Sequence, residues 1–287
     1  MPLRASGSET HHVRIGECDV RYLRVGTGPT VLLVHTLRTQ LEYFFPLIDA
    51  LGPGFDIVVP DLPGHGRSSA PYVEYTAQYF TDAIAQFIGT LNLDHVTFVG
   101  ESIGGSIALA LATPKRSRLA HVVALNPYDY GRGGGIRRSS GLANVLISLM
   151  LWPGVGSLVN AAGTKGILQK VLEGGVVDHT HLPTELVDEL WTCGLLPGHG
   201  RAFLSLLRRW QTWLDARASY GSTGLPITLV YGDHDWSHEP DRTANRQLLS
   251  TASHISLEHS GHFSCLDRPA RVAEIIRQAI TLESRAS

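Results

Sequence analysis

Hydrophobic and polar residues divide the chain into short apolar runs and longer amphipathic stretches. Apolar runs rich in β-branched residues predict strands at 30–35, 56–60, 95–99, 122–125 and 227–231, and alternation of apolar and polar residues predicts another at 254–258. Two alternating runs near the start, 13–18 and 20–25, predict an antiparallel hairpin. The pattern therefore predicts a sheet of eight strands.

Amphipathic helices are predicted between these strands. One apolar set recurs at spacings of three and four, as expected for a helix packed on a sheet: Tyr79, Phe80, Ala83, Ile84, Phe87, Ile88 and Leu91. Residues 271–282 repeat the pattern near the end of the chain. Strands that alternate with helices favour a mostly parallel sheet covered on both faces, so the predicted fold class is α/β.

The alternation stops between about residues 128 and 222. Nearly a hundred residues separate the sixth strand from the seventh, too many for one crossover connection. After a glycine-rich stretch, 131–135, helical patterns occupy 142–152, 184–193 and 201–216. We predict a core domain made of 1–127 and 223–287, with a helical cap, 128–222, inserted after the sixth strand and roofing the site.

A Gly-x-Ser-x-Gly motif lies between a predicted strand and a predicted helix. Ser102 stands in Gly100-Glu101-Ser102-Ile103-Gly104, and the glycines lack the β-carbons that would collide in a tight turn. Such a turn exposes the serine hydroxyl at the carboxyl end of the strand, which favours a nucleophile.

A serine nucleophile needs a base and a carboxylate that orients the base. Asp235 follows the strand at 227–231, and His262 follows the strand at 254–258. These loops open on the same edge of a parallel sheet as Ser102. Asp233 and Asp129 are alternative acids, and the motif spacing favours Asp235.

The motifs together resemble the α/β-hydrolase-fold superfamily, in its capped esterase and carbon–carbon hydrolase branch. The resemblance covers about residues 13–283 and rests on the Ser102 turn and on four further segments. These are Val31–His35, the Asp-x-x-Gly-x-Gly-x-Ser turn at Asp61–Ser68, Gly232-x-x-Asp235, and Gly261-His262-Phe263 followed by Arg268-Pro269. It implies the α/β-hydrolase fold with a triad of Ser102, His262 and Asp235.

One turn departs from the family pattern. The chain has His35-Thr36 where the family usually has His-Gly. The resemblance implies that the backbone N–H groups of Ile103 and Leu37 form the oxyanion hole. Thr36 in place of glycine predicts either a changed turn or a hydroxyl that lines the site. We also place Arg38 and Trp236 among the substrate-binding residues, Arg38 as a cation for a substrate carboxylate, with an exposed loop arginine as the alternative.

Composition bears on the binding partners, the cellular location and the membrane association that we predict for this protein. The chain has 287 residues, a hydrophobic content of 43% and a net charge of −2, which gives no basis for nucleic-acid binding. Three scattered cysteines, Cys18, Cys193 and Cys265, read as free thiols, and the polar start lacks a signal-peptide pattern, so we predict a cytoplasmic protein. The uncharged stretch 141–159 approaches the length of a membrane span, but Pro153-Gly154 and Gly156 interrupt it, so we predict a cap helix.

We therefore predict a serine hydrolase that cleaves a carboxylic ester or lactone with an apolar portion, without a cofactor. His179 and His181 lack further ligands at metal-binding spacing, so no metal is predicted. The alternatives are a carbon–carbon bond hydrolase of a diketone, an acyltransferase or cyclase of biosynthesis, and a ligand receptor that retained the hydrolase frame.

Overall fold

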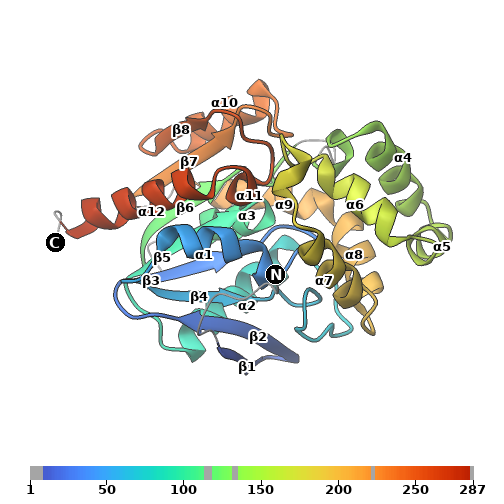
Figure 1. Ribbon diagram of the computed structural model, residues 1–287, viewed down its shortest axis with the longest axis horizontal. Coiled ribbons are helices and arrows are strands. Elements are labelled where there is room, and N and C mark those ends of the chain that lie inside the picture. The colour runs from blue at the N-terminus through green and yellow to red at the C-terminus, as the bar shows by residue number, and fades with distance from the viewer. Residues whose placement is uncertain (1–8, 113–117, 131–134, 221–223, 285–287) are drawn as a thin grey trace.

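An eight-stranded sheet forms the centre of the protein (Figure 1). The computed structural model describes residues 9–112, 118–130, 135–220 and 224–284. The strand order is β1-β2-β4-β3-β5-β6-β7-β8, with antiparallel pairs β1–β2 and β2–β4 and parallel pairs elsewhere. The strands are β1 (Glu9–Ile15), β2 (Cys18–Val25), β3 (Thr30–Val34), β4 (Asp56–Pro60), β5 (Val96–Glu101), β6 (Leu119–Leu125), β7 (Ile227–Gly232) and β8 (Ser253–Leu257).

Helices cover both faces of this sheet. Strands β3 to β6 are apolar along almost their whole length because both of their faces are buried. α1 (Phe45–Leu51) packs with α12 (Pro269–Ser284), and α2 (Ala77–Thr90) packs with α3 (Ile103–Leu111) (Figure 1). The α/β-hydrolase fold predicted from the sequence is thus the fold observed.

The segment between β6 and β7 is helical. Its helices are α4 (Gly141–Met150), α5 (Gly156–Ala161), α6 (Lys165–Glu173), α7 (Thr184–Gly194), α8 (His199–Arg208) and α9 (Trp210–Ala216). Hydrogen bonds attach this segment to the sheet domain on two sides: the Phe263 N–H donates to the Gly175 carbonyl at 2.8 Å, and the Tyr75 N–H donates to Ser205 Oγ at 3.0 Å.

Three details differ from the sequence-based expectation. The first hairpin turns at Gly16, which has a φ of +56°, so Cys18 begins β2 instead of ending β1. The single helix expected over 201–216 is two helices, α8 and α9, which meet at Arg209. The uncharged cap helix expected over 141–159 is divided into α4 and α5, and α6 had no expected counterpart. The glycine-rich stretch 131–134 lies outside the described residues.

Candidate active site

Ser102 lies on a sharp turn between β5 and α3. Its backbone has a φ of +59° and a ψ of −118°, a region that residues with a side chain rarely adopt. The turn depends on its glycines: a Cβ on Gly100 would lie 2.1 Å from the Gly104 carbonyl oxygen, and one on Gly104 would lie 2.1 Å from the Val34 carbonyl oxygen. Steric necessity therefore explains both glycines of the motif.

The structure brings Ser102, His262 and Asp235 together. His262 Nε2 lies 2.9 Å from Ser102 Oγ, and His262 Nδ1 lies 2.5 Å from Asp235 Oδ1. All three residues come from loops at the carboxyl ends of parallel strands, and the side chains of His262 and Asp235 are fully buried. Since the two imidazole nitrogens face different partners, this arrangement can pass the serine proton to the imidazole while the carboxylate fixes the tautomer.

Asp235 is held as a carboxylate by its neighbours. Burial alone would raise its pKa, but the charge and hydrogen bond of His262, together with Ser237, hold the pKa below its usual range. The Ser237 N–H donates to Asp235 Oδ2 at 2.9 Å, and the Tyr130 hydroxyl donates to the same oxygen at 3.3 Å. The negative charge that orients His262 is therefore retained inside the protein.

Asn126, which the sequence analysis missed, joins the acid and histidine loops. Its Nδ2 donates to the His262 carbonyl at 3.0 Å and to Ser264 Oγ at 2.9 Å, while its Oδ1 accepts from the Gly232 N–H at 2.9 Å. Asn126 has a positive φ of 44°, which asparagine tolerates better than most residues. The available signal in the sequence was an asparagine directly after the apolar run of β6.

Glu101, the residue before Ser102, is hydrogen-bonded to the loop that carries His262. Its carboxyl group accepts from the Ser264 N–H at 2.6 Å and from the Tyr43 hydroxyl. Complete burial raises the pKa of Glu101 to about 8, because its charged form would lose its hydration. Sequence reasoning treated this position as the variable residue of the motif, since nothing local shows where its side chain points.

Comparison with known proteins supports the same fold. A family model described as alpha/beta hydrolase fold matches residues 29–151. A structure of a putative epoxide hydrolase from Pseudomonas aeruginosa superposes with a TM-score of 0.83 at 15% identity, over 98% of each chain. The chain therefore has the α/β-hydrolase fold.

Two curated relatives align with most of the chain. The 2-hydroxy-6-oxo-2,4-heptadienoate hydrolase of Pseudomonas putida is 26% identical over 286 residues, which is 97% of this chain and 95% of that protein. An uncharacterized protein of Mycobacterium tuberculosis is 23% identical over 263 residues, 88% of this chain and 75% of that protein. These relatives leave the substrate of this chain open.

In the turn after β3, the residue with an unusual backbone conformation is Arg38. The Thr39 N–H donates to the Thr36 carbonyl at 3.3 Å, which closes a turn around Leu37 and Arg38. Arg38 has a φ of +62°, whereas Thr36 does not have a positive φ. Thr36 can therefore replace the usual glycine without adopting an unusual backbone conformation. The Leu37 N–H has no acceptor among the described residues.

Arg38 borders a small cavity between this turn and helices α7 and α8. Its guanidinium carbon lies 5.0 Å from the centroid of the Phe203 ring, and a Cβ on Gly194 would lie 2.7 Å from Nη2. Desolvation lowers the pKa of Arg38, and no carboxylate among the described residues pairs with it. By contrast, the buried Arg21 pairs with both Asp61 and Glu42.

Trp236 lies against the imidazole of His262. The two rings are stacked, with centroids 3.7 Å apart and planes 11° apart, and the indole Nε1 donates to the Gly174 carbonyl at 2.9 Å. Only 8% of Trp236 is exposed. These contacts fix the ring of His262, and a contact between Trp236 and substrate stays a prediction.

The alternative acids and the histidine pair have other partners. Asp233 accepts from the His259 and Ser260 N–H groups, each at 3.0 Å. Asp129 contacts the Asn245 amide at 3.0 Å, and burial raises the pKa of Asp129 to about 7. His181 Nδ1 lies 2.7 Å from Asp267 Oδ1. In the described residues, Asp235 is thus the acid in contact with His262.

Proposed function

We propose that the protein is a serine hydrolase that cleaves a carboxylic ester or lactone through an acyl-enzyme, without a cofactor. The observation that carries this proposal is the hydrogen-bonded series Ser102–His262–Asp235 on a strained turn. Ser102 attacks the carbonyl, and His262 accepts its proton and later returns it to the leaving group. Asp235 stabilises the imidazolium that forms between these steps.

The oxyanion is proposed to bind to the backbone N–H groups of Ile103 and Leu37. Ile103 begins α3, where the first N–H groups of a helix have no partner within the helix. Leu37 lies in the turn beside the nucleophile motif, since Gly104 packs against the carbonyl of Val34. Each such donor is worth about 3–4 kcal/mol of transition-state stabilisation.

Residues 128–222 are proposed to act as a cap over a core formed by 1–127 and 223–287. This proposal is supported by direct contact between Gly175 and the loop that carries His262. The Gly175 carbonyl accepts from the Phe263 N–H, and the Phe263 ring lies so close to Gly175 that a Cβ there would clash with it. A helical cover can exclude water and shape a pocket for the apolar part of a small-molecule substrate.

Arg38 is proposed to bind a carboxylate of that substrate. A cation that is removed from water and lacks an acidic partner gains most from an anionic ligand. The name of the Pseudomonas putida relative describes a substrate with a carboxylate, which is consistent with an acidic substrate here.

A second candidate reaction is hydrolysis of a carbon–carbon bond. The substrate named for the same relative contains a 6-oxo group and no ester, and that relative aligns over 97% of this chain. The same nucleophile, base and oxyanion donors serve both reactions. The two are distinguished by turnover of a short-chain ester series against a 2-hydroxy-6-oxo dienoate.

The test of the serine mechanism is covalent labelling with a fluorophosphonate. Labelling is expected on Ser102 in the wild-type chain and absent in Ser102→Ala, with loss of ester hydrolysis to at most about 10³–10⁴ above the uncatalysed rate. Ser106→Ala serves as the matched control, because Ser106 is a buried serine of α3, four residues after Ser102. Labelled and active Ser102→Ala protein would refute the mechanism, whereas a labelled wild type that turns over only once would indicate a receptor.

A further inference from the structure

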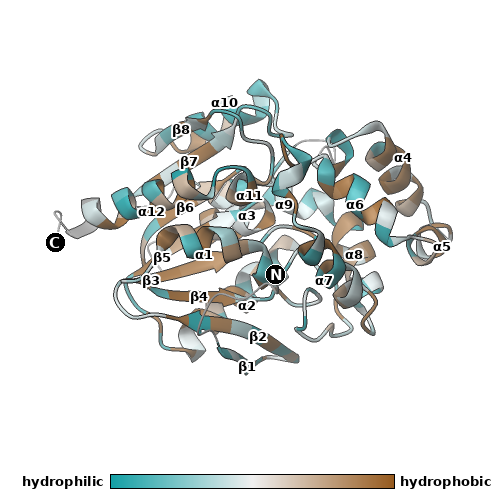
Figure 2. Cartoon of the chain, in the orientation of Figure 1, coloured by the Kyte–Doolittle hydropathy of each residue, from teal (hydrophilic) through white to brown (hydrophobic). Residues whose placement is uncertain are grey.

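The outward face of α4 is apolar, which is unusual for a surface helix. Leu142, Val145 and Leu149 follow one another at spacings of three and four, so they lie on one side of the helix, and Trp152 follows two residues after the end of α4. Val145 is 58% exposed and Trp152 is 60% exposed. The opposite side of the helix holds the buried Ala143 and Ile147, and Figure 2 shows α4 as a largely brown helix.

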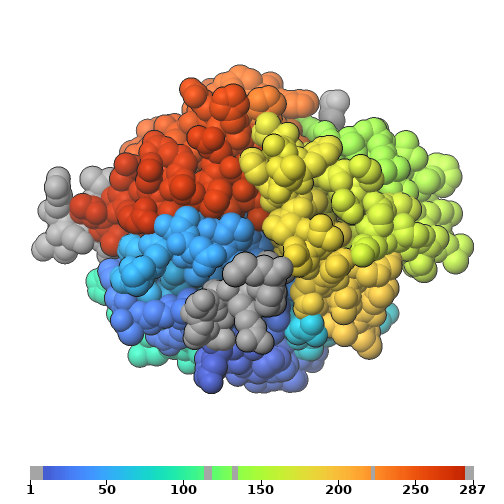
Figure 3. All heavy atoms as spheres, viewed as in Figure 1, coloured from blue at the N-terminus to red at the C-terminus, as the bar shows by residue number. Residues whose placement is uncertain are grey.

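The neighbouring helix α5 also exposes a large apolar side chain. Leu158 of α5 is 72% exposed. Helices α4 and α5 pack together at the end of the molecule opposite α12 (Figures 1 and 3). An ordinary surface helix such as α2 exposes polar side chains instead, Gln78 and Gln86 among them. We call Leu142, Val145, Leu149, Trp152 and Leu158 the α4–α5 patch.

The sequence around the patch is basic and contains no acid. Residues 130–172 include five arginines and lysines and no aspartate or glutamate, in a chain whose net charge is −2. Three of these cations pair with acids, Arg138 with Asp241, Lys165 with Asp188 and Lys170 with Glu173. Arg137 instead donates to the neutral Asn144 Oδ1 at 3.0 Å, so its charge is not compensated.

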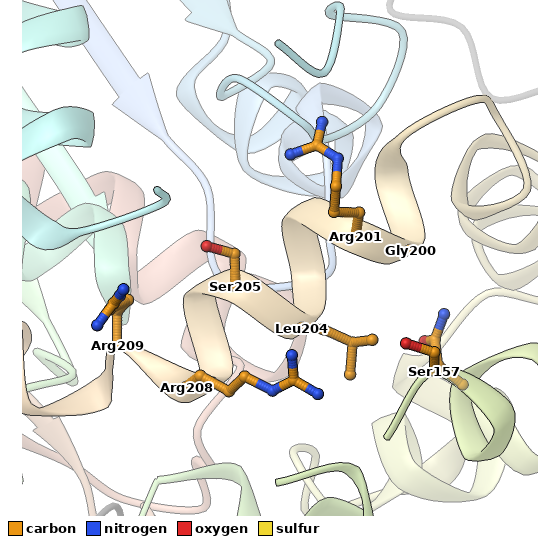
Figure 4. A pocket seen from close by; sticks show the side chains of 8 residues that line it. Ser157, Gly200, Arg201, Leu204, Ser205, Arg208 and Arg209 are labelled. Carbon is orange, nitrogen blue, oxygen red and sulfur yellow. The ribbon is translucent and has the colours of Figure 1, made fainter. Parts of the chain in front are cut away.

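A second uncompensated cation, Arg208, lies beside α5. It lines an open cavity of about 550 Å³ between α5 and α8. Figure 4 shows its side chain on the same side of α8 as Leu204, directed toward Ser157 of α5. A Cβ on Gly156 would lie 3.0 Å from Arg208 Nη2, and no carboxylate among the described residues pairs with this guanidinium.

We propose that the α4–α5 patch is a docking surface for an anionic lipid bilayer. Its apolar side chains would enter the headgroup region, where tryptophan is favoured, while Arg137 and Arg208 meet lipid phosphates at its edges. No helix of the described residues is long and apolar enough to cross a bilayer. The proposed binding is peripheral, and this proposal does not depend on the reaction catalysed.

The charge around the patch favours a bilayer over a second copy of the chain. In a symmetric pair the same patch would face itself, and its uncompensated cations would repel each other. An anionic membrane offers the opposite charge, and each cation near its surface raises partitioning about fivefold.

Sedimentation with vesicles tests the proposal. The wild-type chain is expected to sediment with vesicles of phosphatidylcholine mixed with phosphatidylglycerol, and much less with phosphatidylcholine alone. Val145→Ser combined with Trp152→Ser is expected to lower the partition coefficient at least tenfold, and Arg137→Ala about fivefold. Leu195→Ser is the matched control, because Leu195 is 66% exposed in the same helical segment but lies outside the patch.

The outcomes are distinguishable. No sedimentation of the wild-type chain, equal sedimentation with both vesicle types, or an equal loss in Leu195→Ser would each overturn the proposal. So would a wild-type dimer in size-exclusion chromatography that the double variant converts to a monomer, since the occupant would then be a second copy. Unchanged far-ultraviolet circular dichroism in the double variant shows that a loss of binding is not a loss of fold.

Discussion

The sheet edge around Ser102 and the outer side of the helical segment differ in which side chains they bury. The first buries polar groups, and the second exposes apolar ones. At the sheet edge, buried polar groups such as Asp235 and Asn126 are hydrogen-bonded on several sides. On α4 and α5, large apolar side chains are left exposed. Both arrangements are costly to a folded protein, through desolvation in one region and exposed apolar surface in the other. This difference is what the two proposals require, a reaction at the first region and contact with a bilayer at the second.

The largest expected effect lies at the sheet edge. Asp235→Asn should lower kcat by about 10²–10⁴, because the amide cannot hold the imidazole in the required tautomer. Asp233→Asn is the matched change, since that carboxylate caps backbone N–H groups and does not contact His262. Steady-state kinetics on one ester would check the pair, and a larger loss in Asp233→Asn would transfer the role to that acid.

A second prediction concerns stability and pH at Glu101. The pKa of about 8 in the folded protein exceeds the ordinary value of 4.5, so the folded state retains a proton that the unfolded state has lost. The free energy of unfolding should therefore decrease, by a few kcal/mol in all, as pH rises from about 4.5 to about 8.

Glu101→Gln should flatten that part of the pH profile, because glutamine does not ionise. Urea denaturation between pH 5 and pH 8.5 measures the slope for both proteins. Parallel slopes would mean that another group carries the pH dependence, with the buried Asp129 as the next candidate because its pKa is raised to about 7.

A smaller effect is expected for Arg38, which borders the cavity between the turn after β3 and helices α7 and α8. A charge-assisted hydrogen bond of about 1.5–3 kcal/mol would be lost in Arg38→Ala. KM should then rise about tenfold or more for a substrate with a free carboxylate and change little for its methyl ester. Equal effects on both substrates would assign Arg38 to packing against Phe203.

The smallest effect is predicted on the outer side of the helical segment. Trp152→Ser should change the free energy of unfolding by no more than about 0.5 kcal/mol, because the side chain is 60% exposed. Trp213→Ala in α9 is the contrasting change, since Trp213 is 1% exposed and its removal should cost about 3–5 kcal/mol. Thermal or urea unfolding measures both, and a large loss in Trp152→Ser would mean that this face is not free.

Local sequence pattern was sufficient for the fold and for the three residues that we propose as the triad. Runs of β-branched residues are typical of strands that are buried on both faces, as β5 and β7 are, and the order of motifs placed Ser102, Asp235 and His262 after β5, β7 and the more exposed β8. The α/β-hydrolase fold was therefore predictable, and strand bounds were displaced only by a few residues, as at Cys18, where a glycine turn set the hairpin.

Only the tertiary structure decided which side chains meet across the sheet edge. Asn126, Glu101 and Trp236 contact the histidine loop or its neighbours from strands and loops up to about 160 positions away in sequence. No local pattern encodes such contacts, because they depend on how parallel strands bring distant loops to one edge. The same holds for the apolar face of α4: the sequence showed an uncharged helix, and only packing determined which of its sides remained in contact with solvent.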